Sequence, residues 1–140
     1  MADHLSPEGR SRNMAGIRSK NTKPELALRN ALRLAGATGY RLHRKDLPGR
    51  PDMAFMRWKV AVFVDGVFWH GHPDHWNPDK AASDYWRAKI ARNIERDLAA
   101  DAALIATGWT VVRVWDLDVK GDLAGCVSRV LAALSNKGWP

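Results

Sequence analysis

The stretch "KVAVFV", residues 59 to 64, decides the fold of this chain. It is a nearly unbroken run of β-branched and aromatic residues, and a short run of this kind predicts a strand that is buried on both faces. Asp65 and Gly66 follow directly, so the chain leaves the strand with a carboxylate. We therefore predict a small sheet with this strand at its centre.

The segments before this strand predict a helix and two short strands. In residues 21 to 39, Thr22 suits an N-cap, Pro24 suits the first turn and Gly36 marks the end of a helix. The leucines expected on its apolar faces are Leu26, Leu28, Leu32 and Leu34. Residues 39 to 44 and 51 to 56 are strand candidates, because the turn-rich "KDLPGRP" separates them.

The segments after the strand predict a helix, a strand and a closing helix, at residues 83 to 108, 109 to 115 and 123 to 134. In the long helix, apolar residues recur every four positions, at Trp86, Ile90, Ile94 and Leu98. The predicted order is helix, three strands, helix, strand, helix, which is an α/β fold with one small mixed sheet flanked by helices. We expect a single domain over residues 1 to 140, with a basic arm at about residues 1 to 20.

The charge of the chain indicates a polyanionic partner. The formal net charge is +7, and residues 8 to 50 carry eleven Arg and Lys residues against three acidic ones. This asymmetry favours nucleic acid over a membrane, although a merely solvated basic surface is the alternative. The single cysteine, Cys126, excludes an internal disulfide framework. No apolar run approaches the ~18 residues of a membrane span, and the start lacks a signal peptide's apolar core, so we expect a cytoplasmic protein.

Two carboxylates stand at predicted strand ends. Asp52 opens the second strand and Asp65 follows the third. If these strands are neighbours, both acids emerge at one sheet margin, where they would form an oxygen-rich site suited to Mg²⁺. Each could also be an ordinary turn residue. Glu25 could support this metal through water, or complete the capping box that Thr22 begins.

Three histidines follow in the stretch "FWHGHPDH", residues 68 to 75. His72 and His75 could bind a structural zinc with an oxygen from Asp74 or Asp97. His70 is better placed for proton transfer, since its ordinary pKa of about 6.5 suits general acid or base work at neutral pH.

Aromatic residues beside these histidines indicate contact with bases. Phe68 and Trp69 lie in a polar loop bounded by glycines, where burial is less assured. Such side chains could stack on bases or enter a duplex step. Trp86 could do the same, or be the first core residue of its helix.

Five blocks of the chain, in order and spacing, resemble the very short patch repair (Vsr) mismatch endonucleases. They are "RSRNMAGIRSKNTKPEL", "LPGRPD", "VAVFVDGVFWHGHP", "DYWRAKIARNIERD" and "GWTVVRVW", within residues 10 to 117. The resemblance implies the restriction-endonuclease-like PD-(D/E)XK fold, with an α-β-β-β-α-β core. It also implies Mg²⁺-dependent nicking of duplex DNA on the 5′ side of the thymine in a T:G mismatch, which arises when 5-methylcytosine deaminates.

The resemblance also implies residue roles at the catalytic centre. Asp52 resembles the principal metal carboxylate, and Val64 stands where the family contacts metal through a main-chain oxygen. Asp65 occupies a position that can be His in relatives, and its carboxylate suits Mg²⁺ directly. His70 resembles the histidine that activates water, and Glu25 a supporting acid.

The remaining implied roles concern DNA. Phe68, Trp69 and Trp86 resemble the aromatics that intercalate next to the mismatch, and Met14 resembles a residue that enters the duplex from the other groove. We expect a monomer that acts at the nucleoid, with downstream repair proteins as candidate partners.

Two departures from the family pattern affect these expectations. The fold's name implies a lysine two residues after its second acid, but Val67 stands there, so His70 would carry the proton work. Relatives also bind a structural zinc through Cys and His. Leu117 stands where a cysteine would fall and His72 where relatives often have one, so the zinc site is lost or rebuilt from His72, His75 and Asp97.

The sequence therefore predicts a DNA endonuclease directed at T:G mismatches. One alternative is a nickase of the same fold with different targeting, for instance in phage defence. Another is a non-catalytic DNA-binding module. The flanking bases and the partner cytosine methyltransferase cannot be inferred from the sequence.

Overall fold

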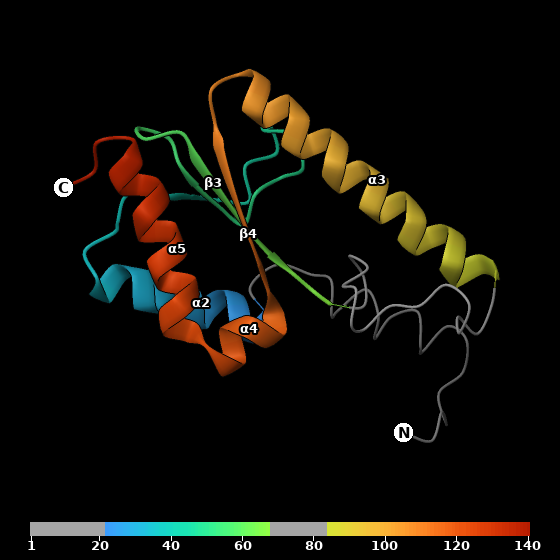
Figure 1. The fold of residues 1–140 in the computed structure, drawn as a ribbon, viewed down its shortest axis with the longest axis horizontal. Coiled ribbons are helices and arrows are strands. Elements are labelled where there is room, and N and C mark those ends of the chain that lie inside the picture. The colour runs from blue at the N-terminus through green and yellow to red at the C-terminus, as the bar shows by residue number, and fades with distance from the viewer. Residues whose placement is uncertain (1–21, 68–83) are drawn as a thin grey trace.

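The computed structural model describes residues 22–67 and 84–140 (Figure 1). The helices are α2 (Lys23–Leu34), α3 (Asp84–Ala106), α4 (Asp116–Gly121) and α5 (Leu123–Asn136). The strands are β1 (Arg41–Leu42), β2 (Met53–Phe55), β3 (Val60–Asp65) and β4 (Thr110–Trp115). None of the described helices is long and apolar enough to cross a membrane.

The four strands form one mixed sheet in the order β1-β2-β3-β4. β1, β2 and β3 are antiparallel neighbours, and Met53 of β2 faces Val62 of β3. β4 pairs parallel with β3, with Phe63 opposite Arg113. The start of β2 therefore lies at the same margin of the sheet as the ends of β3 and β4, as parallel and antiparallel pairing require. The predicted mixed α/β architecture is confirmed.

Helices cover both faces of the sheet (Figure 1). On one face, α2 and α5 pack against alternate strand residues such as Met53, Val62 and Val114. On the other face, Leu104 of α3 packs against Ala61 and Phe63. This alternation follows from the pleat of a strand, which sends successive side chains to opposite faces.

Most predicted elements are confirmed, but three leucines do not lie in the core. Leu28 and Leu32 of α2 are fully buried, whereas Leu26 and Leu34 of the same helix are exposed. In α3, Leu98 is 65% exposed. For Leu98 the reason is that a strict spacing of four residues drifts around a helix of 3.6 residues per turn, so it leaves the buried face after two or three steps. The buried residues of α3 are Ile90, Asn93, Ala100 and Leu104.

The short helix α4 was not predicted. Its sequence "DLDVKG" has no amphipathic repeat, and Val119 is its buried residue. The predicted single domain and basic arm stay predictions, since residues 1–21 lie outside the described part of the chain.

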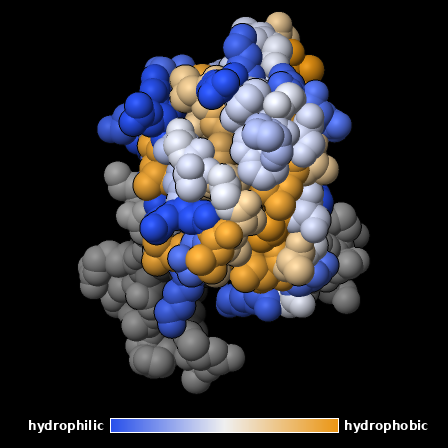
Figure 2. All heavy atoms as spheres, turned by 90° about the vertical axis from the view of Figure 1, so that its left-hand side faces the viewer, coloured by the Kyte–Doolittle hydropathy of each residue, from blue (hydrophilic) through white to orange (hydrophobic). Residues whose placement is uncertain are grey.

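The end of the molecule at which the chain terminates carries a mixed surface. Figure 2 shows this end, with a band of hydrophobic residues between hydrophilic patches. More than half of a folded protein's surface is normally apolar, so the band by itself indicates no function.

Candidate metal centre

Glu25 lies in the first turn of α2, with its side chain only 2% exposed. Thr22 is the N-cap, and its hydroxyl oxygen accepts a hydrogen bond from the Glu25 N–H at 3.4 Å. The predicted N-cap, Thr22, is therefore present. The Glu25 carboxylate, however, points to the sheet, where Oε2 lies 2.7 Å from His43 Nε2. Cap and site thus use different parts of the residue, the backbone N–H and the carboxylate.

The turn between β1 and β2 brings two further groups to this carboxylate. His43 follows β1, and its N–H donates to the main-chain oxygen of Asp52 at 3.4 Å. His43 and Arg50 both have positive φ, 49° and 54°, a conformation that is uncommon outside glycine. The turn therefore places the side chains that precede β2 and follow β1 next to each other.

Glu25, His43 and Asp52 form an acidic group that could hold a metal ion. Their ligand atoms all lie within 4.8 Å of one another. Within residues 22–67 and 84–140 this is the one group of three or more such side chains. Two carboxylates and an imidazole are donors that divalent cations accept.

Asp52 is held at the centre of this group by the neighbouring strand. One of its carboxylate oxygens accepts a 2.6 Å hydrogen bond from the Val64 N–H of β3. Burial nevertheless raises the pKa of Asp52 to about 7, because the Val64 N–H opposes the shift only in part and the charges of Glu25 and Asp65 add to it. The carboxylate is therefore costly to ionise without a cation nearby.

His43 was not singled out in the sequence, although a signal for it existed. The stretch from His43 to Asp52 begins at a predicted strand and returns to another through "LPG". A connection between two neighbouring antiparallel strands brings the residues that flank it to one margin of the sheet.

The Asp65 side chain lies on the face of the sheet opposite to the one that Glu25 packs against. Successive residues of a strand face opposite sides, and Asp65 faces α3 rather than α2. Both of its oxygens accept hydrogen bonds from Nη1 of Arg113 at 3.0 Å. Asp65 as a metal ligand stays a prediction.

Several predicted residues lie outside the described part of the chain: Met14, Phe68, Trp69, His70, His72 and His75. Their roles stay predictions. Val67, the last residue described before this loop, donates its N–H to the Asp116 carboxylate at 3.3 Å. Val67 thus lies at the margin of the sheet where Asp52 lies, directly before the segment that contains the predicted intercalating and proton-handling residues.

Two other predicted residues are on α3. Trp86 is partly buried and packs edge-to-face on Tyr85, with ring centroids 4.9 Å apart. It belongs to neither of the core clusters formed by the described residues. Asp97 lies 3.8 Å from Arg113, and its role as a zinc ligand stays a prediction.

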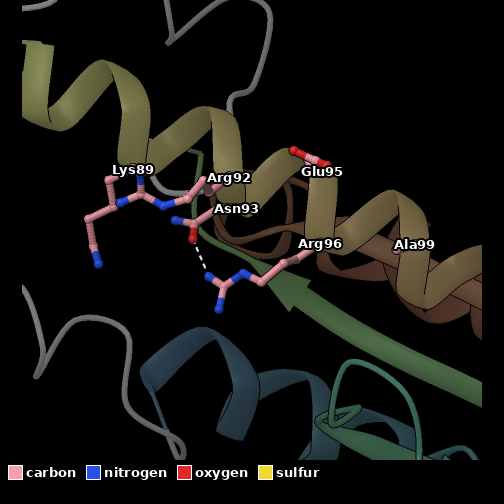
Figure 3. A pocket seen from close by; sticks show the side chains of 6 residues that line it. All are labelled: Lys89, Arg92, Asn93, Glu95, Arg96 and Ala99. Carbon is pink, nitrogen blue, oxygen red and sulfur yellow. Dashed lines mark hydrogen bonds between the residues drawn. The ribbon is translucent and has the colours of Figure 1, made fainter.

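α3 also carries a row of cations along an open hollow of about 470 Å³. Lys89, Arg92 and Arg96 are spaced three and four residues apart, which places them on one side of a helix. Figure 3 shows Asn93 and Arg96 turned toward each other and joined by a hydrogen bond, while Glu95 lies on the opposite side of the helix. This cation row was not predicted, although "RAKIARNIER" carries its spacing.

A mixed sheet with helices on both faces and carboxylates at one margin is the architecture of the PD-(D/E)XK nucleases. The family model described as "DNA mismatch endonuclease Vsr" matches residues 2–77. The type II nicking enzyme V.XorIIP of Xanthomonas oryzae pv. oryzae is 46% identical over 131 residues, covering 93% of this chain and 95% of that protein.

Two further relatives are a second type II nicking enzyme and a DNA mismatch endonuclease. The type II nicking enzyme V.NmeDIP of Neisseria meningitidis serogroup C is 42% identical, over 96% of this chain and 92% of that protein. The DNA mismatch endonuclease Vsr of Escherichia coli K12 is 33% identical, over 86% of this chain and 78% of that protein. The chain belongs to the Vsr family of DNA endonucleases.

Proposed function

We propose that this protein nicks duplex DNA on the 5′ side of the thymine in a T:G mismatch, with Mg²⁺ as its cofactor. The observation that carries the proposal is the group formed by Glu25, His43 and Asp52 at the sheet margin, where the ligand atoms lie within 4.8 Å of one another. A buried site of this charge has little use in an unliganded protein, because each ionised carboxylate destabilises the other.

The residues present fit a divalent cation. Asp52 has a pKa raised to about 7 in the absence of a cation, so a positive charge beside it would favour its ionised form. The Val64 carbonyl oxygen points to the same side of β3 as its N–H, as in any extended strand, and therefore toward Asp52. Hard oxygen donors of this kind suit Mg²⁺.

A divalent cation bound here supplies charge neutralisation at the phosphate and activates water for attack. The chain's own residues hold and orient the reactants. Asp52 and Glu25 would be the carboxylate ligands of such a cation, and the Val64 N–H fixes the orientation of Asp52. His70 takes or gives the proton at its imidazole. The products are a 5′-phosphate and a 3′-hydroxyl.

DNA is held through its phosphates and opened by aromatic side chains. The cation row of α3 and the basic residues before α2 neutralise phosphate charge, so binding weakens as salt rises. Phe68, Trp69 and Trp86 open the step beside the mismatch, and Met14 enters from the other groove. Opening a mismatched step costs less than opening a paired one, which favours the mismatch.

A second candidate function is a nickase with other targeting. It is supported by the printed names of the relatives, since those at 42–46% identity are type II nicking enzymes. Such an enzyme would nick paired and mismatched duplexes at similar rates. A non-catalytic DNA-binding module would nick neither.

A nicking assay separates these functions. Supercoiled or end-labelled duplexes with one T:G mismatch, the matching C:G pair or the T:A pair are incubated with and without Mg²⁺. We expect nicking of the T:G duplex alone, dependent on Mg²⁺. Asp52→Ala is expected to abolish nicking but retain binding, whereas Asp118→Ala, which changes an exposed acid on α4, should nick normally. Nicking by Asp52→Ala would contradict the assignment.

A further inference from the structure

Arg113 of β4 is surrounded by acidic side chains on the face of the sheet that α3 covers. Its Nη1 binds both oxygens of Asp65 at 3.0 Å. Its Nε donates to Asp101 of α3, at 2.8 and 3.1 Å. Asp97, one turn earlier on α3, lies 3.8 Å away. The guanidinium also stacks on the Phe63 ring, with Cζ 3.9 Å from the ring centroid. One cation thus joins β3, β4 and α3.

From its place on β4, Arg113 binds β3 and α3, and these two elements carry the two halves of the proposed site. Asp65 directly follows Val64, the residue whose N–H orients the Asp52 carboxylate. Asp97 and Asp101 lie on the same helix as the cation row that begins at Lys89. The position of the metal centre relative to the phosphate-binding helix therefore depends on this contact.

The chemistry of the contact requires an arginine. A guanidinium is a planar fork that can bind carboxylates on two edges at once and stack on a ring, whereas a lysine ammonium is a single point of charge. The side chain is 19% exposed, and that of Asp65 only 6%. Partners this deeply placed are screened little by water, so they hold a fixed geometry.

We propose that Arg113 is a positioning residue for nicking, and that Asp65 acts through it as its anionic partner rather than as a metal ligand. Arg113 holds the end of β3 against α3, and so keeps Val64 and Asp52 in register with the phosphates bound along α3. The proposal rests on the proposed function of the same site.

The test compares Arg113→Met and Arg113→Lys with wild type. We expect kcat for nicking to fall by about tenfold to a hundredfold in Arg113→Met, since small displacements of a reacting group have effects of this size. Arg113→Lys should recover only part of the loss. The Kd for duplex DNA should change by less than about threefold, because Arg113 does not face DNA in this arrangement. Unchanged kcat in both variants would overturn the proposal.

Two matched controls separate positioning from loss of stability. Arg57→Met removes an arginine that also stacks on an aromatic ring, Trp58, but lies in the β2–β3 turn at the other end of the sheet. Val130→Ala removes buried volume from α5. Both should nick normally at temperatures where all variants are folded. A kcat loss in Val130→Ala as large as in Arg113→Met, at equal shifts in Tm, would make the role of Arg113 merely structural.

Asp65→Asn decides whether Asp65 binds metal. We expect Mn²⁺ binding, followed by electron paramagnetic resonance without DNA, to persist in Asp65→Asn with at most about a threefold weaker Kd. Its kcat loss should match that of Arg113→Met, and the double variant should be no worse than either alone. Abolished Mn²⁺ binding in Asp65→Asn, with normal nicking by Arg113→Met, would assign Asp65 as a ligand and refute the proposal.

Failure of the proposed function would give different results in these assays. In that case wild type itself does not nick the T:G duplex, or Asp52→Ala nicks as well as wild type. If wild type nicks the T:G duplex and Asp52→Ala does not, the proposed function holds. The Arg113 variants then test only the positioning role.

Discussion

At the scale of single residues, Asp52 links the stability of the protein to pH. Burial is the main reason that the pKa of Asp52 is raised to about 7 in the fold, from its ordinary value of 3.8. Between about pH 4 and pH 7 the folded state therefore keeps a proton that the unfolded chain has lost. The stabilising contribution of the neutral carboxyl is complete below about pH 4, falls as pH rises through this window, and is absent above about pH 7.

We expect Asp52→Asn to stabilise the metal-free protein at about pH 8 and to change it little at about pH 4. The asparagine oxygen can still accept the Val64 N–H, and no charge is buried. The gain at high pH is at most about 4 kcal/mol, from a shift of about three pKa units. Urea unfolding in EDTA at the two pH values measures it.

Two further measurements accompany this experiment: a control variant and the addition of Mg²⁺. Asp118→Asn, an exposed acid on α4, should show no such pH dependence. Saturating Mg²⁺ should raise the Tm of wild type but not that of Asp52→Asn, because binding to the folded state alone stabilises it. A wild type more stable than Asp52→Asn at high pH in EDTA would contradict the raised pKa.

The candidate site shows what single residues reveal before a structure exists. Asp52 and Glu25 could be predicted because each stands at a recognisable strand or helix start. The predicted strands place His43 and Asp52 at one margin of the sheet, but the close approach of His43 to both carboxylates depends on a turn with two residues at positive φ. Asp65 is adjacent in sequence to Val64, yet the strand's alternation sends its side chain to the other face, where Arg113 binds it.

At the scale of elements, the turn before β2 depends on Gly49. Its φ is +75°, and a Cβ there would lie 2.8 Å from the Ala100 Cβ of α3 and 3.2 Å from the Phe63 ring. Gly49→Ala should therefore lower the free energy of unfolding by more than about 1 kcal/mol, through backbone strain and overlap together. Urea unfolding measures the change.

Gly36→Ala separates the two causes. Gly36 also has a positive φ, +91°, but nothing lies within 4 Å of the position of an added Cβ. Its variant should show the strain alone. Equal losses in the two variants would mean that contact with α3 does not constrain the turn, and that the turn is held by its own backbone.

The cation row of α3 predicts a specific salt dependence. Each phosphate contact adds about 0.9 to the slope of log K against log salt concentration, because bound counterions are released. We expect Lys89→Gln and Arg92→Gln each to lower the slope by about one in fluorescence titrations of duplex DNA. Arg129→Gln on α5, which removes the same charge from an exposed position, should leave it unchanged. A slope lowered equally by all three would indicate net charge alone.

Most helices and strands could be predicted from the sequence, and the short helix α4 is the exception. β3 and the core leucines of α2 follow from local pattern. α4 is too short to show a helical repeat. It packs on α2, which is far from it in the sequence, and on α5, which follows it. Contacts made only after folding leave no periodic trace in a short segment.

At the scale of the whole molecule, the proposed selection of mismatches depends on aromatic residues from two segments of the sequence. Trp86→Ala and Trp69→Ala are each expected to lower the ratio of nicking on T:G to nicking on paired duplex by about fivefold or more, because stacking on a base contributes ~1–3 kcal/mol. Leu98→Ala, an exposed apolar residue on the helix of Trp86, is the control. An unchanged ratio in both tryptophan variants would refute the proposal that these side chains open the step beside the mismatch.

β4 is one of the two outer strands of the sheet formed by the described residues, and its outer edge has no partner strand among them. Six residues rich in valine would otherwise offer an open template for a strand of another copy. A charged side chain in an edge strand opposes that pairing, because an added strand would bury more of the Arg113 side chain, which is 19% exposed. We therefore expect Arg113 to disfavour pairing of this edge with a second copy of the chain.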